Sequence, residues 1–310
     1  MTLPILILGE ALMDCVMQPD GSLLPLQGGS PYNLTRAAAR QGARVGYLCP
    51  FSQDVFGQQL KATLQADGAQ ALMPDSPNPT SLAVVTLRDG QPSYGFYREG
   101  IADRDYTPEA VLERLRGWPP GVLHSGSLML MPPDHHKAVA VIRGAREMGW
   151  SISVDVNLRP RMAHDLDEYR QAVWQAVALA DWVKASEEDL EVLGLPGLTM
   201  DDAPEAVERF TRLGASRVAI TFGGAGACLQ VQGQQAKAPA PLVSLVDTVG
   251  AGDTFWGACL ADWATRPEGA AERVAETLSR AMTAAAINCE RKGCQPPTLA
   301  ETLAGMHKQE

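Results

Sequence analysis

Hydrophobic runs and amphipathic stretches alternate along most of this chain. The apolar run at residues 3–8 is typical of a buried strand. From about residue 107, helical periodicity and apolar runs follow one another. The predicted helices there cover residues 108–116, 134–148, 165–179 and 202–213. The predicted strands cover residues 121–125, 151–155, 181–185, 217–222 and 227–231. Such alternation predicts a mostly parallel sheet with helices on both faces.

The first hundred residues depart from this alternation. They contain predicted helices at 33–41 and 55–66 and a strand at 45–49. Residues 12–27 and 81–103 lack a helical pattern, and we expect them to form a small β lid. Within the second segment, strands at 81–87 and 93–97 would flank a turn at Asp89 and Gly90. The pattern thus predicts one α/β domain over residues 1–310 that carries a lid.

The C-terminal part is rich in alanine. Helices are predicted over about 253–264 and 270–289, and a short apolar stretch at 242–246 precedes them. We expect the helix that starts near Asp253 to be amphipathic.

Composition narrows the range of partners. The net charge of −10 argues against sequence-independent binding to nucleic acid or anionic membranes. Backbone amides, a metal and a few local cations can still bind a phosphorylated small ligand. Six scattered cysteines without C-x-x-C spacing, and a start without a basic leader, are typical of thiols in a reducing compartment. With no apolar run near the roughly 18 residues that span a bilayer, we expect a cytoplasmic protein.

The segment Asp-Thr-Val-Gly-Ala-Gly-Asp-Thr-Phe, residues 247–255, is the most informative motif. Gly250, Ala251 and Gly252 carry almost no side chain, so the backbone can approach a bound group closely. Their N–H groups and those of the following helical turn form a site for negative charge. A carboxylate at such a site, that of Asp253, suits a reaction in which the carboxylate takes up a proton while negative charge develops on the bound group. The alternative is that Asp253 simply caps the helix.

Two further motifs suit a polyhydroxyl ligand. Gly28-Gly29-Ser30-Pro31-Tyr32-Asn33 opens the first long helix, and the amide of Asn33 can both donate and accept. A plain turn before a helix explains the same residues. Asp14 follows the first strand, where a carboxylate can accept two hydroxyls or can serve a turn.

Polar residues also follow three later strands, where ligands of parallel sheets bind. They are Asp155, Asn157 and Arg159; then Lys184, Ser186, Glu187, Glu188 and Asp189; and then Thr221 with the glycine-rich turn 223–226. Ser186 to Asp189 also matches a helix-capping box, and a plain hairpin explains the glycine-rich turn.

In this order, the motifs resemble those of the ribokinase-like (PfkB) sugar kinases over essentially the whole chain. The two signatures are Gly28-Gly29-x-x-x-Asn33 and the highly specific Asp247-Thr248-x-Gly250-Ala251-Gly252-Asp253-x-Phe255. Among these kinases the chain is most similar to fructokinases, through Phe96-Tyr97-Arg98, Asp155-x-Asn157-x-Arg159 and Lys184-x-Ser186-x-Glu188. The resemblance implies a three-layer α/β/α fold and phosphoryl transfer from ATP to a hexose, with fructose giving fructose 6-phosphate.

The resemblance also implies residue roles. Asp253 would be the base, and the amides of Gly250, Ala251 and Gly252 would stabilise the transferring phosphoryl group. The implied sugar ligands are Asp14, Gly28, Gly29, Asn33, Arg98 and Asn157. The implied nucleotide contacts are Arg159, Lys184, Ser186, Thr221, Gly223, Gly226 and Asn288. Asp247 and Thr248 would hold K⁺, while Glu188 and Asp189 would meet hydrated Mg²⁺ through water. Dimers through the lid are common in such kinases.

Two departures and several alternatives accompany this resemblance. Ribokinases carry Asn-x-x-Glu where this chain has Ser186-Glu187-Glu188-Asp189, and Trp256 stands where smaller residues are usual. One alternative is a 2-keto-3-deoxygluconate kinase, in which Arg98 would pair with the substrate carboxylate. A nucleoside kinase and a non-catalytic sugar sensor are others, although the intact Asp253 and its turn argue against a sensor. A dehydrogenase is disfavoured because G-x-G-x-x-G is missing.

Overall fold

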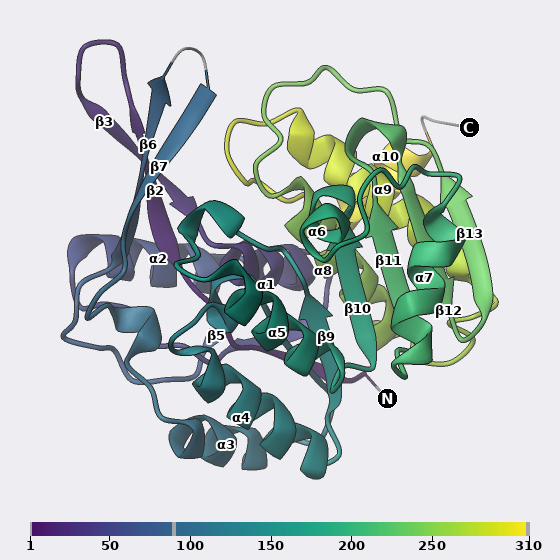
Figure 1. The fold of residues 1–310 in the computed structure, drawn as a ribbon, viewed down its shortest axis with the longest axis horizontal. Helices are drawn as coiled ribbons and strands as arrows, with labels where there is room; N and C mark the ends of the chain where they lie inside the picture. Colours follow the sequence, from purple (N-terminus) through teal and green to yellow (C-terminus); the bar gives the residue numbers. More distant parts are fainter. Residues whose placement is uncertain (1, 89–90, 308–310) are drawn as a thin grey trace.

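The computed structural model describes residues 2–88 and 91–307, so the predicted turn at Asp89 and Gly90 lies outside the described residues. A nine-stranded main sheet forms the centre of the molecule, and a four-stranded sheet stands away from it (Figure 1). Within the described residues no helix is both long and apolar enough to cross a membrane.

The main sheet is mostly parallel, as predicted. Its order is β13 (Gln234–Ala238), β12 (Ala227–Val231), β11 (Arg217–Thr221), β10 (Trp182–Ser186), β9 (Ser151–Asp155), β8 (Val122–Gly126), β1 (Pro4–Ile7), β4 (Arg44–Tyr47) and β5 (Gln70–Ala71). Neighbours from β11 to β5 pair in parallel, whereas β12 and β13 form an antiparallel edge. The central strands are buried on both faces, which explains their continuous apolar runs.

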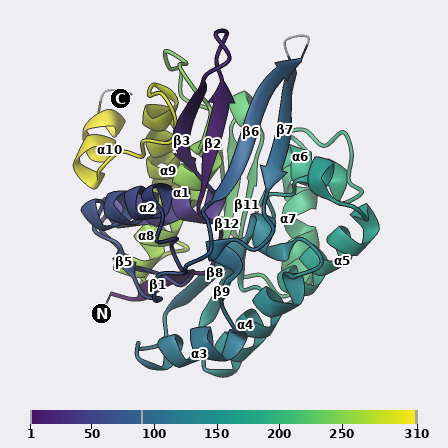
Figure 2. The ribbon, with the colours of Figure 1, turned by 90° about the vertical axis from the view of Figure 1, so that its left-hand side faces the viewer.

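Helices cover both faces of this sheet, which gives the predicted three layers (Figure 2). One layer contains α3 (Pro108–Arg116), α4 (His135–Glu147), α5 (Leu166–Val177) and α7 (Ala203–Arg212). The other contains α1 (Ser30–Arg40), α2 (Val55–Ala66), α8 (Ala251–Thr265), α9 (Val274–Cys289) and α10 (Leu299–Met306). The short α6 (Glu187–Val192) directly follows β10.

The predicted β lid is confirmed. It consists of β3 (Leu23–Gly28), β2 (Leu12–Met17), β6 (Ser81–Arg88) and β7 (Gln91–Tyr97) in that order. The two hairpins join through the parallel pair β2–β6. Because β2 and β6 begin close to the main sheet, residues at those ends lie near its carboxyl edge.

The structure corrects three sequence predictions. Helix α8 is not amphipathic, since all its residues from Asp253 to Ala264 are buried. Its alanine, cysteine and tryptophan side chains surround the axis, and it packs against both α1 and α9, as a helix that is apolar all round must. Helix α9 begins at Val274 rather than 270. The last helix is α10, which was missed because it spans only eight residues; the polar strand β13 and the short α6 and β5 were missed for similar reasons.

Candidate active site

The first turns of α1 and α8 face each other at the carboxyl edge of the main sheet. Helix α8 follows Gly250, whose φ of +74° lies in the left-handed region. A Cβ atom on Gly250 would lie 2.3 Å from the Cys294 sulfur, so only glycine fits there. The predicted small-residue turn before a helix is therefore present, and its amides begin the helix.

Asp253 points from α8 toward α1. Its Oδ1 accepts a hydrogen bond from the Ser30 hydroxyl at 2.7 Å, and its Oδ2 accepts one from Asn33 Nδ2 at 2.9 Å. Among the described residues no side chain caps the start of α8, so Asp253 is an acid in the first turn of this helix and not its N-cap. Burial raises the pKa of Asp253, although these two hydrogen bonds and the charges of Lys184 and Arg159 lower it.

Several predicted sugar ligands lie together under the lid. A Cβ atom on Gly28 would lie 2.2 Å from Oδ2 of Asp14, and one on Gly29 would lie 2.5 Å from the Glu10 carbonyl oxygen. Asn33 lies on the first turn of α1, the turn that contacts Asp253. Burial raises the pKa of Asp14 to about 6, and Arg159 lowers it. These glycines thus allow the start of α1 to approach the Asp14 carboxylate and the main chain at Glu10 closely.

Arg98 and Asn157 have partners within the protein. Arg98 is 7% exposed, and its two Nη atoms donate to Asp103 at 3.2 and 3.3 Å. Arg98 Nη1 also donates to the Ser81 hydroxyl at 2.9 Å. Asn157 has a positive φ of 36°, and its Oδ1 accepts from Arg159 Nη1 at 2.7 Å. Arg98 is therefore held in a buried bidentate ion pair at the base of the lid.

A buried cation lies beside the small-residue turn. Lys184 Nζ donates to the two carboxylate oxygens of Asp155 at 2.9 and 3.0 Å. The same Nζ would lie 3.3 Å from a Cβ atom on Gly252. Burial lowers the pKa of Lys184, but the carboxylates of Asp155, Asp189 and Asp253 outweigh it and raise that pKa above its usual value. Positive charge is thus fixed next to the amides of the turn.

The capping box predicted at Ser186 is confirmed. The Ser186 hydroxyl accepts from the Asp189 amide, and Asp189 Oδ2 accepts from the Ser186 amide at 2.8 Å. Asp189 Oδ1 accepts from the Leu158 amide at 2.7 Å. The carboxylate of Asp189 is therefore engaged by the main chain, whereas Glu188 is exposed.

The glycine-rich turn 223–226 joins β11 to β12 in an antiparallel hairpin. Thr221 is half-buried at the end of β11. Gly223 and Gly226 have φ values of +49° and +124°. A Cβ atom on Gly226 would lie 2.1 Å from the Ala238 carbonyl oxygen, whereas nothing lies within 4 Å of one on Gly224. This hairpin therefore presents open backbone at the carboxyl edge.

The segment 290–298 packs against the residues that precede Gly250. Asn288, which is fully buried, donates to the Val249 carbonyl at 2.8 Å and accepts from the Gln295 amide at 2.8 Å. Asp247 accepts from the Val249 amide at 3.0 Å and from the Gly293 amide at 2.8 Å. Thr248 beside it is exposed. Both predicted residues, Asp247 and Asn288, thus fix the loop that precedes Gly250.

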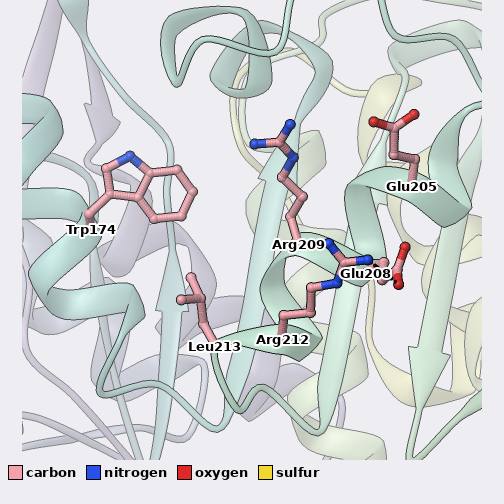
Figure 3. A pocket seen from close by; sticks show the side chains of 6 residues that line it. All are labelled: Trp174, Glu205, Glu208, Arg209, Arg212 and Leu213. Atoms are coloured by element: carbon pink, nitrogen blue, oxygen red, sulfur yellow. Dashed lines mark hydrogen bonds and ion pairs between the residues drawn. The ribbon is translucent and has the colours of Figure 1, made fainter.

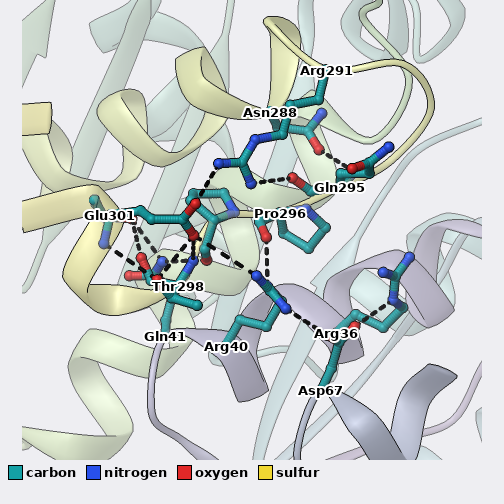
Figure 4. Close-up of polar contacts among 12 residues, drawn as sticks. Arg36, Arg40, Gln41, Asp67, Asn288, Arg291, Gln295, Pro296, Thr298 and Glu301 are labelled. Carbon is teal, nitrogen blue, oxygen red and sulfur yellow. Dashed lines mark hydrogen bonds and ion pairs between the residues drawn. The ribbon is translucent and has the colours of Figure 1, made fainter.

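Helix α1 holds the other side of this segment (Figure 4). Arg36 donates to the Cys294 carbonyl at 3.1 Å, and Arg40 donates to the Pro296 carbonyl at 2.6 Å. Asp67 neutralises both guanidinium groups, at 2.7 Å each. Helix α1 therefore contacts Asp253 through its first turn. Through Arg36 and Arg40, nearer its end, it also contacts the segment 290–298.

Ser30 and Glu10 are central residues for which sequence reasoning proposed no role. Glu10 is 1% exposed, its Oε1 accepts from the Ser30 amide at 3.3 Å, and its Oε2 has no hydrogen-bond partner among the residues that the structure describes. Burial raises the pKa of Glu10 to about 7, although Arg98 lowers it. The position of Glu10 shortly after the first strand is the one sequence feature that could have indicated its place in the site.

Metal-binding side chains do not cluster in the described residues: no group of three or more His, Cys, Asp or Glu there is placed to hold an ion. A hollow between α5 and α7 is lined by Trp174, Glu205, Glu208, Arg209, Arg212 and Leu213 (Figure 3). None of the predicted site residues lines it, and its Arg212–Glu208 ion pair is exposed.

Comparison with known proteins gives one consistent result. The model of a family described as "pfkB family carbohydrate kinase" matches residues 5–301. A fructokinase of Vibrio alginolyticus is 31% identical over 95% of this chain and 96% of its own. The structure of a Xylella fastidiosa fructokinase with bound ATP matches with a TM-score of 0.86 and 26% identity, over 100% of this chain and 99% of its own.

A Salmonella enterica kinase with another substrate is also similar. The structure of this aminoimidazole riboside kinase, complexed with aminoimidazole riboside and an ATP analog, has a TM-score of 0.82 and 25% identity, over 98% of this chain and 99% of its own. The fold is thus shared with kinases that are named for different substrates.

Proposed function

Because this chain belongs to the pfkB family of carbohydrate kinases, we propose that it transfers the γ-phosphoryl group of ATP to a hexose, converting fructose to fructose 6-phosphate. Asp253 is the single observation that carries this proposal. It is a buried carboxylate beside an anion-binding turn and opposite the glycine-rich start of α1. A base and a site for developing negative charge are thereby adjacent.

The proposed chemistry requires little covalent participation by the protein. As the sugar oxygen attacks the γ-phosphorus, its proton passes to Asp253 and the bond to the leaving ADP oxygen breaks. The amides of Gly250, Ala251 and Gly252 would donate to the phosphoryl oxygens, that of Ala251 in exchange for its bond to the Thr248 carbonyl at 3.2 Å. Lys184 adds a fixed positive charge nearby. The lid excludes water, which limits idle hydrolysis of ATP.

Ligand contacts follow from the same arrangement. We assign the sugar to Asp14, Gly28, Gly29, Asn33 and Asn157, with Arg98 at its border. We assign the nucleotide to Arg159, Lys184, Ser186, Thr221, Gly223, Gly226 and Asn288. Asn288 would act through the Val249 carbonyl that it holds.

Two metal ions fit this assignment. Bound Mg²⁺ would neutralise the phosphate oxygens, and we assign its water shell to Glu188, which is exposed, as Glu187 beside it is. The lack of a three-ligand cluster among the described residues suits an ion held mainly by phosphates and water. Asp247 and Thr248 would hold K⁺ beside the turn.

The state of Arg98 favours a neutral sugar over 2-keto-3-deoxygluconate. Asp103 already neutralises the Arg98 guanidinium and accepts one N–H from each of its Nη atoms, so a substrate carboxylate would have to share an arginine whose charge is already compensated. Asp14 adds negative charge on the sugar side and would repel a substrate carboxylate. These contacts support fructose, which has no charge to pair.

A substrate panel tests the proposal. ADP release would be measured with fructose, ribose, glucose, tagatose, 2-keto-3-deoxygluconate and aminoimidazole riboside, each with and without K⁺. We expect the highest kcat/KM for fructose, and stimulation by K⁺. A preference for the keto acid or the riboside would overturn the choice of fructose. Thermal stabilisation by a sugar without ADP release would favour a non-catalytic sensor.

A further inference from the structure

The Ser30 hydroxyl has a position that neither signature motif explains. It lies on the first turn of α1, it is 7% exposed, and it donates to Oδ1 of Asp253 at 2.7 Å. Asn33, one helical turn later, takes the other carboxylate oxygen at 2.9 Å. Two adjacent points on one helix therefore fix both oxygens of a single carboxylate.

Ser30 is itself fixed on its main-chain side. Its amide donates to Oε1 of the buried Glu10 at 3.3 Å. The neighbouring Gly29 has a φ of +104°, and a Cβ atom on it would lie 2.5 Å from the Glu10 carbonyl oxygen, so only glycine allows this entry of the chain into α1. The main chain thus fixes the position of Ser30, and with it the position from which the hydroxyl reaches Asp253.

We infer that Ser30 is a positioning residue for Asp253: its hydroxyl fixes one carboxylate oxygen, so that a remaining lone pair of the carboxylate faces the sugar hydroxyl. This inference rests on the proposed function for its role in turnover, but the contact itself does not. The serine transfers no proton and makes no bond to substrate.

The hydroxyl also favours the ionised form of Asp253. A donor to a carboxylate lowers its pKa, and Ser30 is the largest of the influences that lower this one against burial. The other donor from α1 is Asn33. The charged and titratable groups around Asp253 are Lys184 on β10, Arg159 after β9, Asp155 at the end of β9 and Cys294 in the segment 290–298. Ser30→Ala changes none of them, so its effect on titration is attributable to the lost hydroxyl.

The experiment compares Ser30→Ala with Ser30→Thr and with Ser216→Ala. Ser216 is a matched control, since its hydroxyl donates one hydrogen bond, to the Asp181 carbonyl at 3.2 Å, before β11 at the opposite edge of the sheet. We expect Ser30→Ala to lower kcat about tenfold, to leave the KM for ATP within about twofold, and to move the acidic limb of the pH–kcat profile up by about one pH unit. Ser30→Thr restores the hydroxyl and should return the limb toward the wild-type position.

A second measurement does not depend on turnover. The ¹³C signal of the Asp253 carboxyl, assigned with Asp253→Asn, would be titrated in the wild type and in Ser30→Ala. The inference predicts an upward shift of about one pH unit in the variant. An unchanged titration, or a loss of kcat that follows thermal instability and appears equally in Ser216→Ala, would overturn it. Wild-type protein without sugar-dependent ADP release would instead refute the proposed function, and the carboxyl titration would still decide the role of Ser30.

Discussion

Helix α8 carries two buried carboxylates, one in its first turn and one near its end, and they are held differently. Asp253 accepts hydrogen bonds from a serine hydroxyl and an asparagine amide. Asp262, which is fully buried, accepts from Arg280 at 3.0 Å, from Thr277 at 2.8 Å and from Arg266, with which it forms a close ion pair. Two acids on one helix thus differ in their direct partners, which are uncharged donors for Asp253 and two guanidinium groups with a hydroxyl for Asp262.

The contrast separates an acid compensated by charged partners from one whose hydrogen-bond donors are uncharged. Asp262 is compensated by two guanidinium groups, so its charge stabilises the packing of α8 against α9. Among the described residues, the side chains that donate hydrogen bonds to Asp253 are uncharged, and burial raises its pKa. A carboxylate in that state can accept a proton, and such perturbed groups are concentrated at functional sites.

The largest expected effect comes from Asp253→Asn. The amide keeps the size of the side chain but cannot take a proton, so kcat should fall by about 10³-fold, within the range for general-base catalysis. Steady-state ADP release measures this, and thermal unfolding checks that the fold persists. Activity within tenfold of the wild type would contradict the assignment of the base.

At the other end of the helix, Asp262→Asn should affect stability instead. It leaves the buried Arg280 guanidinium without its anion, whereas the half-buried Arg266 keeps Glu276 at 2.7 Å. Removing one partner of a buried ion pair costs about 3–5 kcal/mol of unfolding free energy. Urea denaturation measures the loss, and kcat of the folded protein should remain within about twofold. The exposed pair Glu208–Arg212 supplies the control, since Arg212→Ala should cost about 0.5 kcal/mol or less. A large loss of kcat in Asp262→Asn would remove the distinction between the two acids.

Glu10→Gln should give the smallest of the three effects. It tests whether Glu10, a second buried acid near Asp253, also lacks a positive charge that offsets its burial. Burial raises the pKa of Glu10 from 4.5 to about 7, so the folded state holds the proton more tightly than the unfolded state. This contribution is fully present below pH 4.5 and is lost as the pH rises through about 7. Relative to the variant, the wild type should therefore lose about 3 kcal/mol between pH 4.5 and 8.

Urea unfolding of both proteins at pH 5 and pH 8 checks this expectation. Parallel pH dependence in the two proteins would show that Arg98, whose charge faces Glu10, compensates it fully.

Local sequence patterns predicted much of the fold. Helices α2 and α3 begin and end where their periodicity and caps indicate, with Asp54 and Thr107 as N-caps. The lid, the parallel sheet and the turn at Gly250 were predicted in the same way, because strand alternation, caps and glycine turns depend on neighbours a few residues apart. The short α10 and the polar β13 gave too few residues for a pattern.

The sequence by itself determined the elements and the acid at the start of α8, because both are written in consecutive residues. Only the tertiary structure decided which acids are compensated. Ser30 contacts Asp253 across 223 positions, and only the fold shows that Asp103 and Ser81 accept hydrogen bonds from Arg98. Charge compensation in a buried site depends on which distant side chains the fold brings within hydrogen-bonding distance, and no local pattern encodes that.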